Sequence, residues 1–268
     1  MNLLITLNSD YIFPLCVMLH SLSQSNKDNH FDIYVAYSSL TEDDFRMMKK
    51  ALGNSDAVLH RIPVDENIFN SAPSLSRISK ETYYRLLISE LIPDGVDRIL
   101  YLDPDIVIKK DLHELYDIDM QGKTVAAATH MFHSVKRFNL RRLGLKPDSN
   151  YINAGVMLID VEKWKKEAST DEVLRFISNN LKKLKLADQD VVNMMFEDNI
   201  LLVDETKFNL DEKIFFAKSH RIYTKNTIGL DWVRKNTVIV HYNGRHKPWR
   251  EKKYSGKLGE YFERYKNF

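Results

Sequence analysis

The sequence has little cysteine, glycine or proline, and each shortage excludes a class of protein. Its 268 residues include one cysteine, Cys16, so neither an intramolecular disulfide nor a cysteine-based zinc site can form. Nine glycines and seven prolines are about half the usual share, which predicts few flexible linkers. Lysine and arginine number 39 against 37 for aspartate and glutamate, and this balance argues against a dedicated nucleic-acid-binding protein.

Long apolar runs are missing as well. No stretch reaches the roughly 18 consecutive apolar residues of a membrane-spanning helix. The first residues carry no basic segment, and Asn8 and Asp10 interrupt the apolar run that starts at Leu3, so we expect no signal peptide. A hydrophobic content of 44% with 28% charged residues is typical of a globular protein with a large core. We therefore expect a cytoplasmic protein.

Short apolar runs alternate with helical patterns along the chain. The expected strands are 3–7, 31–37, 57–62, 98–102, 124–129, 154–159, 200–203 and 238–241. The expected helices are 13–25, 41–52, 79–91 and most of 161–196. Strands separated by helices predict βαβ units and an α/β fold with a largely parallel sheet. In such sheets ligands bind beyond the carboxyl ends of the strands, so functional residues are sought there.

Two aspartates follow the expected strand 98–102. Asp103 and Asp105 are separated by Pro104, so in extended backbone both side chains project to the same side. Two carboxylates placed where a sheet meets a loop repel each other unless a cation lies between them, and Mg²⁺ and Mn²⁺ prefer such oxygen ligands. An Asp-Pro-Asp turn without a ligand is the alternative. The apolar strand before the pair and the Ile-Val-Ile run after it favour a metal site.

Two further motifs stand at the start of expected elements. Asn-Ala-Gly at 153–155 introduces the strand 154–159, and its glycine permits close approach of another group. A β-bulge with a turn stabilised by the asparagine is the alternative. Asp-Gln-Asp at 188–190 opens a helix, where an N-cap with acidic residues that complement the helix dipole is the alternative.

A fourth motif follows the expected strand 238–241. His241 ends this strand, and a neutral imidazole is a good metal ligand. Gly244 leaves backbone N–H groups accessible, and Lys247 offers a positive charge for a phosphate. A single histidine is more often a structural residue, but one followed by glycine and lysine favours a binding site.

Together the four motifs resemble those of the family 8 glycosyltransferases, in order and separation, from residue 3 to about residue 249. This family contains retaining, metal-dependent enzymes that use nucleotide sugars, among them bacterial lipopolysaccharide glucosyl- and galactosyltransferases and the glycogenin branch. The resemblance implies a GT-A fold, with a Rossmann-like mixed sheet, in one domain over residues 1–250, followed by a tail at 251–268. It also implies a UDP-sugar donor and Mn²⁺, with Mg²⁺ as the alternative, coordinated by Asp103, Asp105 and His241.

The resemblance also implies the residues that bind the donor. The residues that would bind the uridine are at the end of the first strand, and Arg85 would lie along the donor. Residues of the second and third motifs would hold the sugar ring, and the fourth motif would hold the β-phosphate. The full set is Thr6, Asn8, Asp10, Tyr11, Arg85, Asp103, Pro104, Asp105, Asn153, Ala154, Gly155, Asp188, Gln189, Gly244 and Lys247.

The catalytic residues that the resemblance implies are Asp188 and Gln189. Gln189 takes the position of a nucleophile but is a neutral amide, so we expect attack by the acceptor on the face that the leaving group occupies. Asp188 would anchor sugar hydroxyls. Two positions depart from the family pattern. The loop of Asn8 and Asp10 replaces a run of alanine and aspartate, and Pro104 has no N–H to donate.

The C-terminal segment is basic and aromatic. Residues 245–268 contain eight lysines and arginines and three glutamates, interleaved with aromatic residues, a composition that suits peripheral contact with anionic lipid. A solvated helix packed on the domain is the alternative.

The expected function is hexose transfer from a UDP-sugar to a glycan or glycolipid such as lipopolysaccharide. A metal-dependent nucleotide-sugar hydrolase and an inactive sugar-nucleotide-binding module are the alternatives. Acceptor contacts are expected at Phe132, His133, 136–146 and 215–220.

Overall fold

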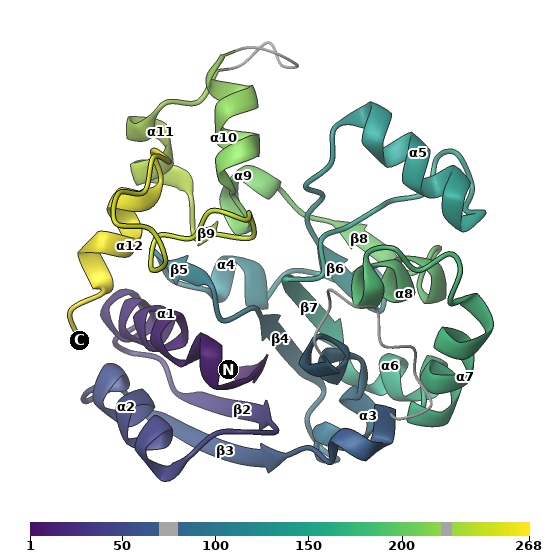
Figure 1. Ribbon diagram of the computed structural model, residues 1–268, viewed down its shortest axis with the longest axis horizontal. Coiled ribbons are helices and arrows are strands. Elements are labelled where there is room, and N and C mark those ends of the chain that lie inside the picture. Colours follow the sequence, from purple (N-terminus) through teal and green to yellow (C-terminus); the bar gives the residue numbers. More distant parts are fainter. Residues whose placement is uncertain (70–79, 221–226) are drawn as a thin grey trace.

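A central sheet with helices on both sides forms the body of the chain (Figure 1). The structure is a computed structural model that describes residues 1–69, 80–220 and 227–268. Its strands are β1 (Asn2–Leu7), β2 (Phe31–Tyr37), β3 (Ala57–Pro63), β4 (Arg98–Leu102), β5 (Ile106–Ile108), β6 (Val125–Ala127), β7 (Val156–Asp160), β8 (Ile200–Leu202) and β9 (Ile239–His241). Short 3-10 helices are η1 (Ser9–Tyr11), η2 (Glu66–Phe69) and η3 (Lys80–Leu86).

The α-helices surround this sheet. They are α1 (Ile12–Ser25), α2 (Glu42–Leu52), α3 (Ile88–Leu91), α4 (His113–Tyr116), α5 (His133–Leu143), α6 (Val161–Glu167), α7 (Thr170–Asn180), α8 (Ala187–Met195), α9 (Glu205–Phe208), α10 (Glu212–Ser219), α11 (Leu230–Asn236) and α12 (Gly259–Tyr265). None of the helices within the described ranges is long and apolar enough to cross a membrane.

Within the described ranges, the large sheet has the strand order β3-β2-β1-β4-β7-β6-β8. The strands β3, β2, β1 and β4 are parallel to one another. The strand β7 runs antiparallel to both of its neighbours, and β6 pairs parallel with β8. The strands β5 and β9 form a separate antiparallel pair. The expected α/β fold with a mixed, mostly parallel sheet is confirmed, although the direction of β7 was not predicted.

Alternating side chains of the strands build a core on each face of the sheet. Leu3 and Ile5 of β1 pack with α1 and α2 on one face. Leu4 points to the other face, where Trp164 of α6 and residues of α3, α7 and α8 bury it. Because side chains of a strand alternate between faces, this pattern requires helices on both sides.

Several expected elements differ in detail from the observed ones: the strand expected at 124–129 is shortened to β6, and the helical stretch expected over 161–196 is divided into α6, α7 and α8. The helix expected at 79–91 is divided into the 3-10 helix η3 and the single turn α3, and residue 79 lies outside the described residues. The strand expected at 154–159 begins at Val156, so Asn153, Ala154 and Gly155 form the segment that leads into β7. This shift leaves the Asn-Ala-Gly motif at the edge of the sheet, where its side chains are available to the site.

The C-terminal segment packs on the domain. Tyr261 and Phe262 of α12 are buried together with Val107 and Val240 of the small sheet. The ring of Phe262 contacts the ring of Phe13 in α1. The packed helix, which the sequence left as an alternative to membrane contact, therefore holds the aromatic side chains at these positions.

Candidate active site

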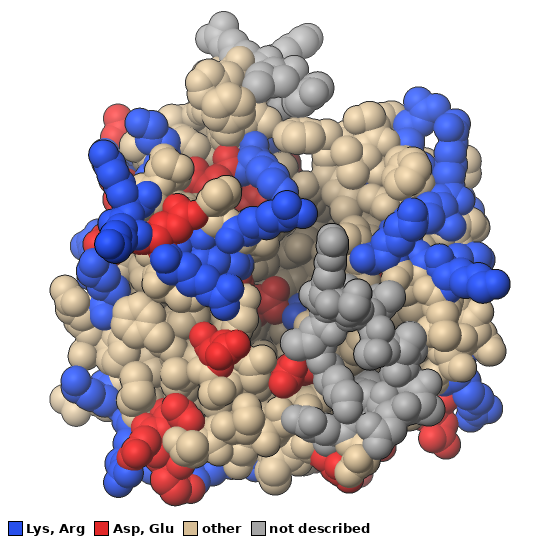
Figure 2. Space-filling model, in the orientation of Figure 1, with Lys and Arg blue, Asp and Glu red and all other residues tan. Residues whose placement is uncertain are grey.

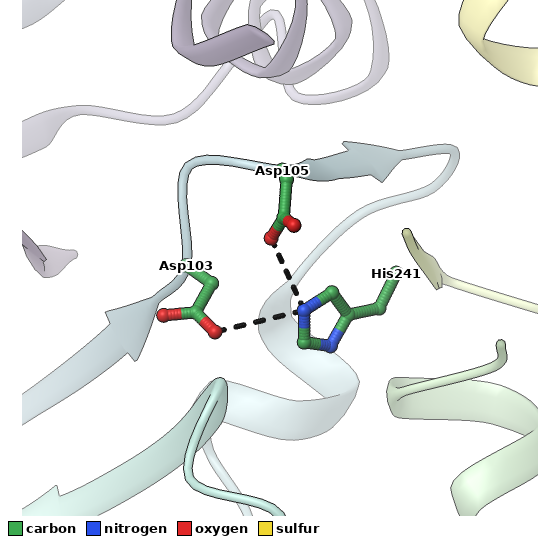
Figure 3. A group of neighbouring side chains, drawn as sticks. All are labelled: Asp103, Asp105 and His241. Carbon is green, nitrogen blue, oxygen red and sulfur yellow. Dashed lines mark ion pairs between the residues drawn. The ribbon is translucent and has the colours of Figure 1, made fainter. Parts of the chain in front are cut away.

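The cluster that could bind a metal forms where β4, β5 and β9 meet. Asp103 follows β4, and Asp105 precedes β5. Since β5 pairs with β9 and Ile106 lies opposite His241, the register of this pair brings the imidazole beside the two aspartates. His241 Nε2 lies 3.2 Å from Asp105 Oδ1 and 3.6 Å from Asp103 Oδ2 (Figure 3). One ligand atom from each residue lies within 4.8 Å of the others.

The chemistry of this cluster fits a divalent cation. Two carboxylate oxygens and one imidazole nitrogen are ligands that Mn²⁺ accepts and that leave positions for a phosphate. Burial raises the pKa of the Asp105 carboxyl, but His241 and Lys247 outweigh this effect and lower it to about 2. Asp105 therefore carries its negative charge at neutral pH and is ready to bind a cation.

Gly155 has no side chain, and the candidate metal ligands occupy the space where a Cβ atom would lie. Its carbonyl accepts a hydrogen bond of 2.8 Å from the backbone N–H of Asp103. A Cβ atom at position 155 would overlap Asp103 Oδ2 and the His241 ring carbon Cε1. The glycine of the Asn-Ala-Gly motif is thus required by close approach of the candidate metal ligands.

Arg85 of η3 lies between Asp103 of the cluster and Asp188 of α8. Its guanidinium lies 2.9 Å from Asp103 Oδ1 and 3.1 Å from Asp188 Oδ2. It also donates to the carbonyl of Ala154 at 3.0 Å and stacks over the ring of Tyr101. The Arg85 side chain is about 10% exposed, so these charges interact in a poorly solvated environment.

The carboxyl group of Asp188 has a raised pKa. Burial raises the pKa of its carboxyl to about 6, and the negative Asp103 adds to this increase while Arg85 opposes it. The preceding residue, Ala187, has a left-handed φ of 44°. A strained backbone and a shifted pKa at the start of one helix are typical of functional sites.

A cleft of about 540 Å³ lies over these residues. It contains every residue expected to bind the uridine, the sugar ring and the metal, except His241, which is buried. The lining consists of Thr6, Leu7, Asn8, Asp10, Tyr11, Glu81, Thr82, Arg85, Asp103, Pro104, Asp105, Asn153, Ala154, Gly155, Leu186, Asp188 and Gln189.

Lys247 and Gly244, the two residues expected at the β-phosphate, are not among the residues that line the cleft. Lys247 is buried, and its ammonium group donates to Asp105 Oδ2 at 2.5 Å and to the carbonyl of Tyr242 at 2.6 Å. Lys247 therefore brings a positive charge to the candidate metal cluster, while no contact of Gly244 with the cleft is observed.

Comparison with known proteins identifies the family. Residues 2–253 match the family description "Glycosyl transferase family 8". The chain belongs to this family. General stress protein A of Bacillus subtilis is 27% identical over 248 residues, 90% of this chain and 84% of the relative. A lipopolysaccharide 1,2-glucosyltransferase of Escherichia coli is 26% identical over 91% of this chain and 72% of that enzyme. The glycosyltransferase GlyF of Streptococcus pneumoniae is 25% identical, but the match covers 57% of its length.

Solved structures show the fold of this family 8 glycosyltransferase. The galactosyltransferase LgtC, solved with donor and acceptor sugar analogues, superposes with a TM-score of 0.84 at 24% identity and covers 99% of this chain and 95% of LgtC. The glycosyltransferase GlyE of Streptococcus pneumoniae gives a TM-score of 0.73 at 21% identity and covers 100% of this chain and 60% of GlyE. The expected GT-A fold is confirmed.

The space at Gly155 gives a first prediction for this glycosyltransferase. Gly155→Ala should weaken Mn²⁺ binding more than about tenfold, because the added methyl group displaces Asp103 and His241 from each other. The measurement is titration with Mn²⁺ followed by electron paramagnetic resonance. Gly229→Ala is the control, since no atom lies within 4 Å of its Cβ position. Equal Mn²⁺ affinity in both variants would contradict the prediction.

The raised pKa of Asp188 gives a second prediction. Because the pKa of the folded state, about 6, lies above the reference value of 3.8, the neutral carboxyl stabilises the fold below that reference value, and this contribution is lost as the pH rises through 6. Between pH 4 and 7 the native enzyme should lose about 2–3 kcal/mol of unfolding free energy relative to Asp188→Asn. Urea denaturation at a series of pH values measures this difference, and parallel pH curves would contradict it.

The sequence analysis did not predict two residues whose side chains form hydrogen bonds with the candidate metal ligands, nor the lining residues Leu7, Glu81, Thr82 and Leu186. Asn209, which follows α9, accepts from His241 Nδ1 at 2.8 Å. Tyr101 of β4 donates to Asp103 Oδ1 at 2.8 Å, and its hydroxyl lies 3.1 Å from Thr6 Oγ1. Tyr101 stands two residues before Asp103 on the same side of the strand, and this spacing could have indicated it. No pattern around Asn209 marks it in the sequence.

Proposed function

We propose that this glycosyltransferase moves a hexose, with retention of configuration, from a UDP-sugar to a glycan or glycolipid acceptor, with Mn²⁺ as the metal. The observation that carries the proposal is the cluster of Asp103, Asp105 and His241 beside a cleft of about 540 Å³. A volume of this order is enough for a small-molecule substrate. The donor and acceptor analogues bound to LgtC, and the lipopolysaccharide glucosyltransferase activity of the relatives, support this assignment.

The cation would be held by the two aspartates and the imidazole, and when bound it supplies positive charge to the departing diphosphate. Lys247, beside Asp105, adds a second positive charge at this end of the cleft. Arg85 adds a third between Asp103 and Asp188. Thr6, Asn8, Asp10 and Tyr11 of the β1–α1 segment line the same cleft and are proposed to bind the uridine. These charges would lower the barrier because UDP departs with concentrated negative charge.

The residues beside the sugar favour a reaction without a covalent enzyme intermediate. Gln189 is a neutral amide, and its Oε1 accepts a hydrogen bond of 3.1 Å from Asn153. Asp188 is paired with Arg85, which makes its carboxylate a holder of hydroxyl groups more than a nucleophile. We propose same-face attack, with a departing phosphate oxygen that accepts the acceptor proton. Mass spectrometry of a glycosylated Asp188 or Gln189 during turnover would overturn this mechanism.

The acceptor is proposed to bind beside α5 and α10, which stand at the top of Figure 1. Phe138 of α5 and Phe216 of α10 are 61% and 56% exposed, and large exposed aromatic side chains suit contact with a sugar or a lipid. Arg137 and Arg141 are exposed on α5. Figure 2 shows lysine and arginine on both sides of a central hollow that contains acidic side chains.

Incubation with UDP-hexoses and Mn²⁺, with and without sugar acceptors, tests the proposed function. Release of UDP that depends on an acceptor is expected of a transferase. Release to water would indicate the hydrolase, and donor binding without release would indicate the binding module. A thermal-shift screen of UDP-hexoses with Mn²⁺ should first identify the donor, because a ligand that binds only the folded state raises the melting temperature.

Peripheral contact of the tail with the inner face of a membrane is proposed through its exposed cations alone. Lys252, Lys253 and Lys257 are exposed, whereas the tail aromatic residues Tyr261 and Phe262 are buried. Removal of the whole tail would therefore disturb the core. Replacement of the three lysines by glutamine should lower co-sedimentation with anionic liposomes by at least about tenfold. Equal binding of the native and charge-depleted enzymes would remove the membrane contact.

A further inference from the structure

Three side-chain amides connect the candidate metal ligand His241 with the sugar side of the cleft. His241 Nδ1 lies 2.8 Å from Asn209 Oδ1. Asn209 Nδ2 donates to Asn153 Oδ1 at 3.1 Å, and Asn153 Nδ2 donates to Gln189 Oε1 at 3.1 Å. Asn209 has no exposed surface, and its bond with His241 is buried, so water does not compete for that bond. The chain of amides therefore leads from the buried imidazole to Gln189, which lines the cleft.

A backbone group fixes the direction of every hydrogen bond in this chain. The N–H of Gly155 donates to Asn153 Oδ1 at 3.0 Å, and a backbone N–H cannot act as an acceptor. The oxygen of Asn153 therefore faces Asn209, which must present its NH₂ group there. The Asn209 oxygen is then left for His241 Nδ1, which must carry the proton.

We propose that Asn209 is a positioning residue that holds His241 in the tautomer with the proton on Nδ1. The lone pair of Nε2 then faces Asp103 and Asp105, where a cation needs it. The opposite tautomer would place an N–H group against the two carboxylates and would exclude the metal. This inference rests on the proposed function only for the metal, because the tautomer is a property of the protein without ligands.

The backbone of Asn209 is held independently of its side chain. Its carbonyl accepts from His130 Nε2, and its N–H donates to the carbonyl of Glu205 at 3.3 Å. Substitution of the side chain therefore leaves the main-chain contacts in place.

Two variants separate the acceptor and donor functions of the Asn209 side chain. Asn209→Asp keeps the acceptor for His241 and loses the donor to Asn153, and Asn209→Leu loses both.

The test compares the native enzyme with Asn209→Asp and Asn209→Leu at a pH where imidazole is neutral. Nitrogen-15 NMR of the metal-free protein, with His241 assigned from a His241→Gln variant, should show the Nδ1–H tautomer in the native enzyme and in Asn209→Asp. A mixture of tautomers is expected in Asn209→Leu. The Mn²⁺ affinity of Asn209→Leu should be about 10- to 100-fold weaker than that of the native enzyme, whereas the affinity of Asn209→Asp should stay near the native value.

Asn139→Leu is the matched control, because Asn139 of α5 is also a buried asparagine, and its side-chain oxygen accepts from Arg142 and not from a candidate metal ligand. Its Mn²⁺ affinity should equal that of the native enzyme. An Nε2–H tautomer in the native enzyme, or native tautomer and affinity in Asn209→Leu, would overturn the proposal. A native enzyme that binds no Mn²⁺ would contradict the proposed function instead, and the NMR result would still decide whether the amides fix the tautomer.

Discussion

Asp103→Asn is expected to lower sugar transfer about a thousandfold, because the variant loses a charged oxygen that would hold the cation at the leaving group. The unfolding free energy should change by less than about 1 kcal/mol. Arg85 keeps its contacts with Asp188 and Ala154, and Tyr101 still has an oxygen to which it can donate. Release of UDP with saturating acceptor and urea denaturation measure the two quantities.

The matched control for this substitution is Asp117→Asn, which removes an exposed carboxylate after α4. Transfer by the control should equal that of the native enzyme. Asp103→Asn with undiminished transfer in the presence of EDTA would refute the metal site. Asp105 is less suitable for the test, since its removal leaves the buried Lys247 without its carboxylate partner.

Asp190→Asn is expected to destabilise the fold by about 3–5 kcal/mol, because it leaves a charged arginine without its partner in the interior. The Asp190 side chain has no exposed surface and accepts two hydrogen bonds, of 2.8 and 2.9 Å, from Arg142. It also accepts from Tyr151 and from the backbone N–H groups of Lys185 and Leu186. An amide offers one oxygen to these donors and brings its own N–H groups among them.

Urea denaturation of Asp198→Asn provides the comparison for this effect. Asp198 pairs with Lys146 on the surface, with side chains 73% and 57% exposed, so its loss should cost less than about 1 kcal/mol. Equal stability of the two variants would contradict the role of Asp190. Because Asp190 ties down the segment that leads to Asp188, its loss should also raise the KM of the donor.

The sequence predicted the parts of the site that are local in the chain. Asp103 and Asp105 could be paired because the side-chain period of a strand is two. The strands β1, β2 and β4 were predicted because each is a mostly apolar segment of at least five residues, whereas the three-residue strand β5 was recognised only as an apolar run after the aspartates. The division of 79–91 into η3 and α3 was not predicted, since tertiary contacts decide such breaks.

The parts that depend on tertiary contacts could not be predicted from local patterns. His241 was placed at the metal by resemblance, and the pairing of β5 with β9 that brings it there has no local signature. Asn209 was missed for the same reason, because its partners His241 and Asn153 are distant in the chain. Asp190 was found as part of a motif, but only packing distinguishes its buried ion pair from the neighbouring Asp188 in the cleft.

The pairing of β5 with β9 has a consequence for biosynthesis. Asp103 and Asp105 lie between β4 and β5, whereas the imidazole of the cluster comes only with β9, more than 130 residues later in the chain. A nascent polypeptide arrested before residue 239 contains the strands described for the large sheet and still lacks the third ligand. The candidate metal cluster is therefore complete only after translation has passed residue 241.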